Sequence, residues 1–203
     1  LGDVYKRQAR FLPVRYVTCK IHGPLMEESE ATYIITEDGT AVIEMAAASG
    51  LPLVATSFRN PMNTTTFGTG EMIADALDKG CRNFVLGLGG SATNDAGIGA
   101  LNALGISFKN DKKQELKPIG RNLTQIAHID ISCLRPELQE SSFVIACDVT
   151  NPFAGKNGAA YIYAPQKGAS PEEVDFLDKG LQHYSKIILK ETGIDISMLE
   201  GAG

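Results

Sequence analysis

One segment of this sequence carries the residue types and the spacing that binding of an anion requires. Residues 86–95 read Leu-Gly-Leu-Gly-Gly-Ser-Ala-Thr-Asn-Asp. The apolar run 84–86 predicts a buried strand before this turn, and the small residues 96–105 predict a helix after it. Such a turn directs several backbone N–H groups, and the positive end of the helix dipole, toward one point. The segment therefore predicts a site for a phosphate or a carboxylate.

Other interpretations of the glycine-rich turn are weaker or remain open. A Walker-type loop needs a Gly-Lys-Ser/Thr ending, which this turn lacks, and a dinucleotide fingerprint fits only in its weak form. A tight structural turn with an Asn/Asp cap is the remaining alternative. The density of polar groups favours the anion site, which we assign to Gly89, Gly90, Ser91, Thr93 and Asn94.

Carboxylates follow several predicted strands. Asp95 lies just beyond one strand, Asp148 directly follows another, and Asn151 comes shortly after it. In open α/β sheets, ligands bind beyond the carboxyl ends of the strands. Asp95 and Asp148 are therefore candidates for holding Mg²⁺ or accepting the proton of a hydroxyl, with a helix cap or turn as the alternative. For Glu44, at a third strand end, the cap or turn is favoured.

A threonine-rich loop and two isolated cations complete the candidate site. Capping the following helix accounts for one threonine, so the others are available to donate hydroxyls to phosphate. For a lone Arg or Lys in a polar loop, solvation at the surface is favoured, but a substrate carboxylate or phosphate needs one such cation. These candidates are Thr65, Thr66, Thr69, Arg59 and Lys167.

Composition and charge limit the class of protein. The 203 residues suffice for one large domain or parts of two, and 43% apolar with 21% charged residues predicts a folded core. A net charge of −5 argues against general nucleic-acid binding, and no apolar run approaches the length of a membrane span. Four cysteines without a Cys-x-x-Cys pair argue against zinc and are compatible with the cytoplasm.

The pattern of elements predicts an α/β fold. We expect strands over residues 14–21, 30–36, 40–45, 84–86, 106–108 and 142–147, the last of them buried. We expect helices over residues 46–49, 70–80 with Thr69 as N-cap, 96–105, 122–127 and 171–191, the last opened by a Ser-Pro-Glu-Glu capping box. The alternation implies a parallel or mixed sheet covered on both faces by helices, preceded by an antiparallel hairpin region.

Four separated groups of motifs share their order and spacing with one known family. They lie at residues 42–51, at 59–73, at 89–105, and at 147–169, which includes Cys-Asp-Val-Thr-Asn-Pro and Pro-Gln-Lys-Gly-Ala. From about Val14 to the end, the chain resembles the type I glycerate kinase family. Ala96 departs mildly from the pattern, because that family often has glycine there.

The resemblance implies transfer of the γ-phosphoryl group of ATP, with Mg²⁺, to a hydroxyl of D-glycerate, expected to be the 2-hydroxyl. Family chains have two α/β domains with the active site in the cleft between them. We expect residues 1–8 to be a non-native leader and residues 9–203 to be a partial glycerate kinase, inactive alone. These residues would contain most of one domain and only short segments of the second.

The implied site has Asp95 and Asp148 as catalytic residues and as the Mg²⁺ ligands, with the other candidates binding phosphate or substrate. The expected partners are the small molecules glycerate and ATP, with neither nucleic acid nor membrane. Two alternatives stay open: a nucleotide- or dinucleotide-binding module without kinase activity, and an inactive fragment.

Overall fold

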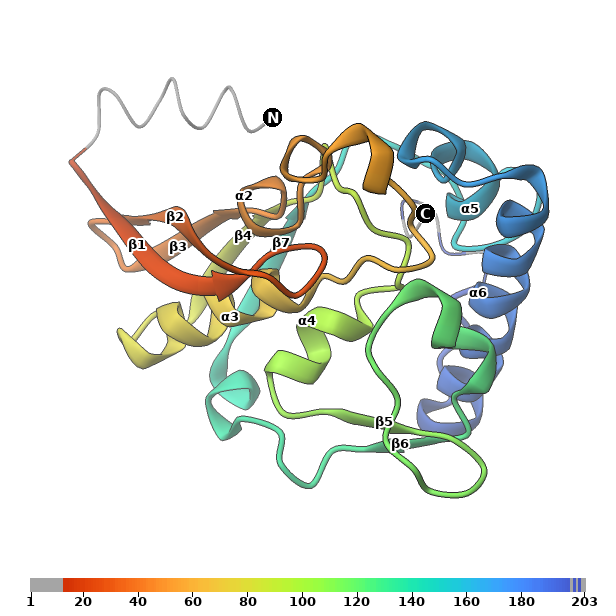
Figure 1. The fold of residues 1–203 in the computed structure, drawn as a ribbon. Coiled ribbons are helices and arrows are strands. Elements are labelled where there is room, and N and C mark those ends of the chain that lie inside the picture. Colours follow the sequence, from red (N-terminus) through yellow and green to blue (C-terminus); the bar gives the residue numbers. More distant parts are fainter. Residues whose placement is uncertain (1–12, 198, 200, 202–203) are drawn as a thin grey trace.

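The computed structural model describes residues 13–197, 199 and 201, so the expected leader at residues 1–8 lies outside the described residues. Its main sheet is mixed and five-stranded, with the strand order β1-β2-β3-β4-β7 (Figure 1). The strands are β1 (Val14–His22), β2 (Glu28–Thr36), β3 (Thr40–Glu44), β4 (Asn83–Gly87) and β7 (Ser142–Ala146). The first three run antiparallel, whereas β3, β4 and β7 are parallel, which confirms the mixed α/β sheet.

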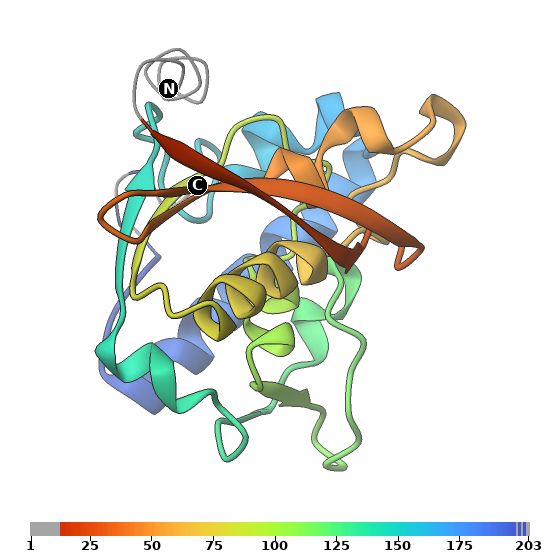
Figure 2. The same cartoon turned by 90° about the vertical axis from the view of Figure 1, so that its left-hand side faces the viewer.

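Helix α3 (Phe67–Asp78) covers one face of this sheet (Figure 2). Its apolar stripe, which includes Met72, meets Ile43 and Phe84 in a core from which water is excluded. At the edge of that core, the Tyr33 hydroxyl donates to Asp75 Oδ2 at 2.7 Å. The parallel strands β3 and β4 connect through this helix, because a parallel pair needs a long crossover connection.

The opposite face of the sheet is more open than the sequence predicts. Register places Tyr16, Ile34, Val42, Val85 and Val144 in one row across all five strands. The row ends in side chains that are 62% exposed at Tyr16 and 60% exposed at Val144. The expected burial of the 142–147 strand is therefore wrong, because within the described residues β7 pairs with β4 alone and forms an edge.

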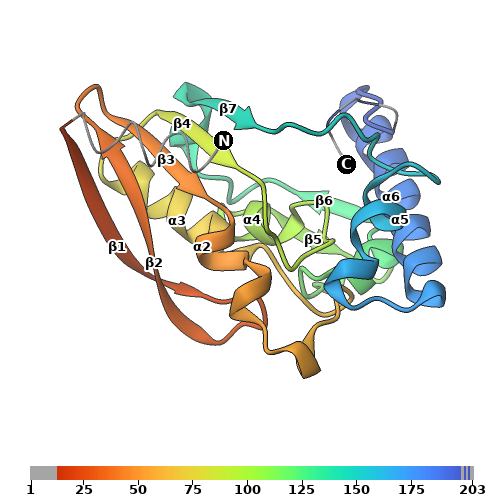
Figure 3. The same ribbon diagram turned by 90° about the horizontal axis from the view of Figure 1, so that it is seen from above.

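A second core lies beside the sheet, between α4 (Ile98–Ala103), the small sheet of β5 (Ser107–Lys109) and β6 (His128–Asp130), and α6 (Pro171–Thr192) (Figure 3).

Helix α6 begins with the predicted capping box. The Ser170 hydroxyl accepts from Glu173 N at 3.3 Å, and Glu173 Oε2 accepts from Ser170 N at 2.9 Å. The remaining helices are α2 (Ala46–Ser49) and α5 (Ala159–Tyr163), with 3-10 turns at Leu51–Leu53, Thr56–Phe58, Gly120–Gln125, Pro136–Glu140 and Pro165–Lys167.

Three predicted helix boundaries are wrong. Helix α3 begins at Phe67 with Thr66 as N-cap, so Thr69 lies inside the helix. Helix α4 begins at Ile98, because the backbone at Ala96 and Gly97 has positive φ angles of 53° and 73°. The helix expected at 122–127 is the 3-10 turn at Gly120–Gln125.

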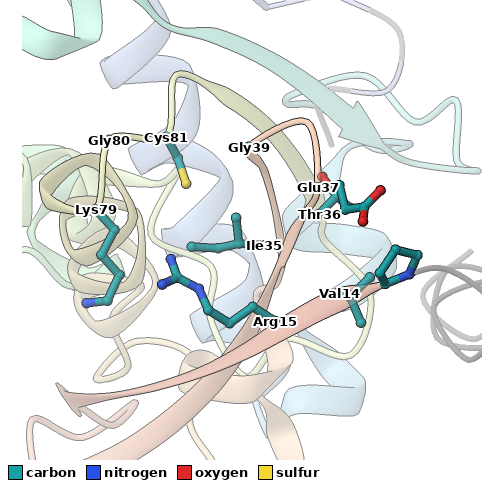
Figure 4. Close-up of a pocket in the computed structure, with 10 residues that line it drawn as sticks. Val14, Arg15, Ile35, Thr36, Glu37, Gly39, Lys79, Gly80 and Cys81 are labelled. Atoms are coloured by element: carbon teal, nitrogen blue, oxygen red, sulfur yellow. The ribbon is translucent and has the colours of Figure 1, made fainter.

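One hollow of about 500 Å³ opens at the end of the sheet where β3 and β4 begin (Figure 4). It is lined by Arg15, Thr36 and Lys79, among others, and contains none of the predicted site residues. No helix within the described part of the chain is both long and apolar enough to cross a membrane.

Candidate functional site

The carboxyl ends of three parallel strands meet at one edge of the sheet. Glu44, Gly87 and Ala146 are in register across β3, β4 and β7. The glycine-rich turn leaves this edge after Gly87, and Asp148 follows Ala146 by two residues. Two predicted site segments, the glycine-rich turn and the loop with Asp148, therefore begin side by side at the carboxyl ends of β4 and β7. Ligands bind beyond this end of the strands in open α/β sheets.

The glycine-rich turn is held by a short backbone pairing with the segment after α2. Ala92 N donates to Ser49 O at 2.8 Å, and Leu51 N donates to Gly90 O at 2.9 Å. Within the described residues, the N–H groups of Gly89, Gly90 and Ser91 have no hydrogen-bond partner. Gly89 and Gly90 are exposed, and the left-handed backbone at Gly90, with φ +76°, is one that glycine adopts without strain.

Lys167 reaches this turn from the 3-10 turn at Pro165–Lys167. Its Nζ donates to Ser91 Oγ at 2.8 Å and to Thr93 O at 2.6 Å. The side chain is 8% exposed, so solvation at the surface is the wrong interpretation of this lysine. Burial lowers the pKa of Lys167 to about 8, although the negative charge of Asp95 acts to raise it.

Asp95 is the most completely enclosed carboxylate of the candidate site, at 1% exposure. Its Oδ2 accepts from Thr66 N and Thr66 Oγ1, both at 2.8 Å, and from Gly99 N at 3.2 Å. Its Oδ1 accepts from Gly97 N at 3.2 Å. Burial raises the pKa of this carboxyl, and the hydrogen bonds from Thr66, Gly97 and Gly99 oppose that rise.

These contacts correct one expectation about the turn. The N-terminal amides of α4 were expected to face a ligand, but they face the carboxylate of Asp95. Four donors already occupy its two oxygens, so Asp95 is a poor match for a metal ligand or a proton acceptor. Within the described residues, the amides of this turn that remain unpaired are therefore those of residues 89–91 and not those at the start of α4.

The threonine hydroxyls are directed into the protein. Thr65, Thr66 and Thr69 are at most 3% exposed. Thr66 Oγ1 accepts from Ala100 N at 2.9 Å, Thr65 Oγ1 accepts from Phe67 N at 3.2 Å, and Thr69 Oγ1 lies 2.9 Å from a serine hydroxyl of α2. These residues hold the start of α3 against the turn and the start of α4. Their role in binding phosphate stays a prediction.

Arg59 lies next to the segment that carries Lys167. Its Nε donates to Val54 O at 3.1 Å, and the guanidinium makes no other hydrogen bond or ion pair within the described residues. A Cβ on Gly168 would lie 2.2 Å from Arg59 O, so the glycine, at φ +98°, permits this close approach. Arg59 therefore remains a candidate for an anion near Lys167.

The loop after β7 is organised by Asn151. Its Nδ2 donates to Asn157 O at 2.9 Å, and its Oδ1 accepts from the Tyr163 hydroxyl at 2.7 Å. Nothing local in the sequence links an aromatic residue on α5 to this loop, so Tyr163 is not among the predicted site residues. Asp148 is exposed. Mg²⁺ in proteins is commonly held by one or two carboxylates together with substrate phosphates and water, and the exposed Asp148 is accessible for such a contact.

Within the residues that the structure covers, no group of three or more His, Cys, Asp or Glu side chains lies together as a metal cluster. The assignment of Mg²⁺ to Asp148 stays a prediction.

Comparisons with known proteins agree with the motif resemblance. The profile of the Glycerate kinase family matches residues 6–203. The chain is 45% identical over 190 residues to the glycerate kinase of Haemophilus influenzae and 47% identical over 184 residues to the glycerate 2-kinase of Escherichia coli. The aligned regions cover 93% and 90% of this chain but 50% and 48% of those proteins.

A crystal structure assigned to glycerate kinase 2 of Salmonella typhimurium LT2 matches with a TM-score of 0.94 at 41% identity. The match covers 98% of this chain and 53% of the solved one. The chain thus spans about half the length of the relatives it matches. Similarity of this extent in family profile, sequence and fold shows that the chain belongs to the glycerate kinase family.

Proposed function

We propose that this chain supplies the anion-binding part of an enzyme that phosphorylates D-glycerate with ATP. The family and the names of the relatives support the kinase class. The name of the Escherichia coli relative supports the 2-hydroxyl as acceptor, giving 2-phosphoglycerate. The observation that carries the proposal is the buried Lys167 ammonium, held on a turn whose neighbouring amides are unpaired within the described residues.

Phosphoryl transfer asks a protein mainly to position its reactants and to neutralise their charge. In this proposal the amides of Gly89, Gly90 and Ser91 donate to anionic oxygens, and Lys167 and Arg59 supply positive charge. Asp148 orients the acceptor hydroxyl or holds Mg²⁺, because it is exposed at the strand-end edge. When bound, Mg²⁺ supplies further neutralisation of the phosphate charge.

Asp95 has a positioning role in this proposal, unlike the catalytic one expected from the sequence. Its hydrogen bonds join the starts of α3 and α4. It therefore fixes the path of the turn without touching the reactants. Thr65, Thr66 and Thr69 support the same arrangement from the side of α3, and Asn151 supports the loop that carries Asp148.

ATP and glycerate are metabolites of the cytoplasm, where we place the reaction. Free thiols agree with that compartment, since all four cysteines are free.

Ligand binding to the chain itself tests the proposal against the dinucleotide-binding alternative. Thermal unfolding is followed with ATP and Mg²⁺, with D-glycerate, and with NAD. Stabilisation by the first two supports the kinase assignment, because a ligand that binds the native state raises its unfolding temperature. Stabilisation by NAD alone supports the dinucleotide module, and no stabilisation by any ligand supports an inactive fragment.

Turnover is measured on a chimera in which residues 13–203 replace the matching half of the Escherichia coli relative. Phosphorus NMR of the product separates 2-phosphoglycerate from 3-phosphoglycerate. A folded chimera that binds both substrates and forms neither product contradicts the proposed function.

A further inference from the structure

Lys167 is a buried ammonium without a carboxylate partner. At 8% exposure it loses most of its hydration, yet no Asp or Glu of the described residues lies within ion-pair distance of Nζ. Both of its described hydrogen bonds go to neutral oxygens of the turn, Ser91 Oγ and Thr93 O. A neutral donor would satisfy these oxygens at a lower cost of desolvation. The negative charge of Asp95 favours the ammonium form of Lys167 but makes no direct contact with it.

The contact with Ser91 constrains the hydroxyl of that serine. A hydroxyl has one proton to donate and two lone pairs to accept with. Lys167 donates to one of those lone pairs, so the Ser91 proton cannot be given back to a protonated Lys167. That proton has no acceptor within the described residues, and Ser91 is half-buried, so its hydroxyl is not sealed from solvent.

Ser91 directly follows the two glycines whose amides are also unpaired within the described residues. A Cβ on Gly89 would meet nothing within 4 Å, so the backbone there is open to the approach of a ligand. Three consecutive residues thus offer hydrogen-bond donors that are unpaired within the described residues. Donors of this kind suit a carboxylate or phosphate oxygen, which has lone pairs but no proton to give.

We propose that Lys167 acts through Ser91: the buried ammonium fixes the serine hydroxyl as a donor toward an anionic oxygen bound over residues 89–91. Lys167 is then a positioning residue that need not touch the ligand. The ligand chemistry is a carboxylate or a phosphate, as found in glycerate and in ATP. The inference rests on the proposed function, because it assumes that the turn binds one of these anions.

A double-mutant cycle tests this relay on the chain itself. The variants are Ser91→Ala, Lys167→Met and the double variant, and the dissociation constants of inorganic phosphate and D-glycerate are measured separately by calorimetry at pH 7. We expect each single variant to weaken binding of the recognised anion by about tenfold, as loss of a hydrogen bond to a charged group does. The double variant should bind no more weakly than either single one.

Two exposed positions provide matched controls, Ser132→Ala and Lys179→Met, which should leave both dissociation constants unchanged. Losses that add in the double variant overturn the relay, because Lys167 then acts on the anion independently of Ser91. A Lys167→Met variant that binds normally overturns it as well. The anion that responds identifies the ligand group.

The wild-type chain separates failure of the relay from failure of the proposed function. If it binds neither phosphate nor D-glycerate, the anion site is overturned together with the relay.

If Lys167→Met does not fold, the pH dependence of binding in the wild type and in Ser91→Ala replaces the double-mutant cycle. Neutral Lys167 can accept the serine proton, so the wild type should lose affinity on deprotonation of Lys167. An equal loss in Ser91→Ala overturns the relay.

Discussion

Asp95 Oδ2 accepts hydrogen bonds from both the backbone N–H and the hydroxyl of Thr66, each at 2.8 Å. The two residues are 29 positions apart and stand where α4 and α3 begin. This contact places the glycine-rich turn against the threonine-rich loop. The two segments that the sequence singled out are therefore one structural unit, held together by a buried carboxylate.

Replacing Asp95 tests that structural role. Asp95→Asn places an amide NH₂ group among donors that need an acceptor, so we expect a loss of about 2–4 kcal/mol in the free energy of unfolding. Urea denaturation followed by circular dichroism measures it. Asp111→Asn, at an exposed position, is the control and should change stability little. An Asp95→Asn chain as stable as the wild type would contradict the anchoring role.

Replacing Asp148 tests the proposed catalytic edge. Because the side chain is exposed, Asp148→Asn should leave the unfolding temperature unchanged. In the chimera it should lower turnover by more than tenfold, about 1.4 kcal/mol of barrier. Glu140→Gln, also exposed, is the matched control. A loss smaller than tenfold in Asp148→Asn would contradict the proposed role of Asp148 at the strand-end edge.

Gly99 is predicted to tolerate no side chain. A Cβ there would lie 2.3 Å from Thr65 Oγ1 and 2.6 Å from Phe67 N. We expect Gly99→Ala to cost about 2–4 kcal/mol of stability, because backbone on the α3 side must move. The control is Gly89→Ala, whose Cβ would have open space, and thermal unfolding compares the two. Equal stability of both variants would show that α3 and α4 approach less closely than described.

The pH dependence of stability should report Lys167. Its pKa is lowered by burial to about 8 in the folded chain, below the unfolded value near 10.5. Between these values the unfolded chain binds more protons, so this group makes the free energy of unfolding rise with pH. The half-buried thiol of Cys19 and the buried thiol of Cys81 have raised pKa values, which act in the opposite sense. The difference between the wild type and Lys167→Met isolates the effect of Lys167 from theirs.

Urea titrations between pH 7 and 10 measure this difference. A wild-type curve parallel to that of Lys167→Met would mean that Lys167 is not buried as a charged group.

Tyr163 is predicted to steady the loop that carries Asp148. Tyr163→Phe removes the hydrogen bond to Asn151 Oδ1 and should cost about 1 kcal/mol of stability. Tyr16→Phe is the control, since the Tyr16 side chain is 62% exposed. Hydrogen exchange of residues 148–158 should become faster in Tyr163→Phe alone. Unchanged exchange would show that the other contacts of Asn151 suffice.

Local signals in the sequence determined the elements and the position of the glycine-rich turn. The strands predicted at 14–21, 30–36 and 40–45 and the helix opened by Ser170 rest on residue types, turn residues and a capping box, which act within a few residues. The structure confirms them with shifts of at most two residues at their ends. The family followed from the order of several motifs along the chain. These features depend on neighbours in sequence, so they can be read without a fold.

Only the tertiary structure decided which groups are paired. Lys167 meets Ser91 across 76 positions and Thr66 meets Asp95 across 29. No periodicity encodes such contacts, because the partner of a buried polar group depends on how whole elements pack. Asp95 and Asp148 both follow strands in the sequence. The packing of whole elements surrounds the Asp95 carboxylate with protein hydrogen-bond donors but leaves Asp148 exposed.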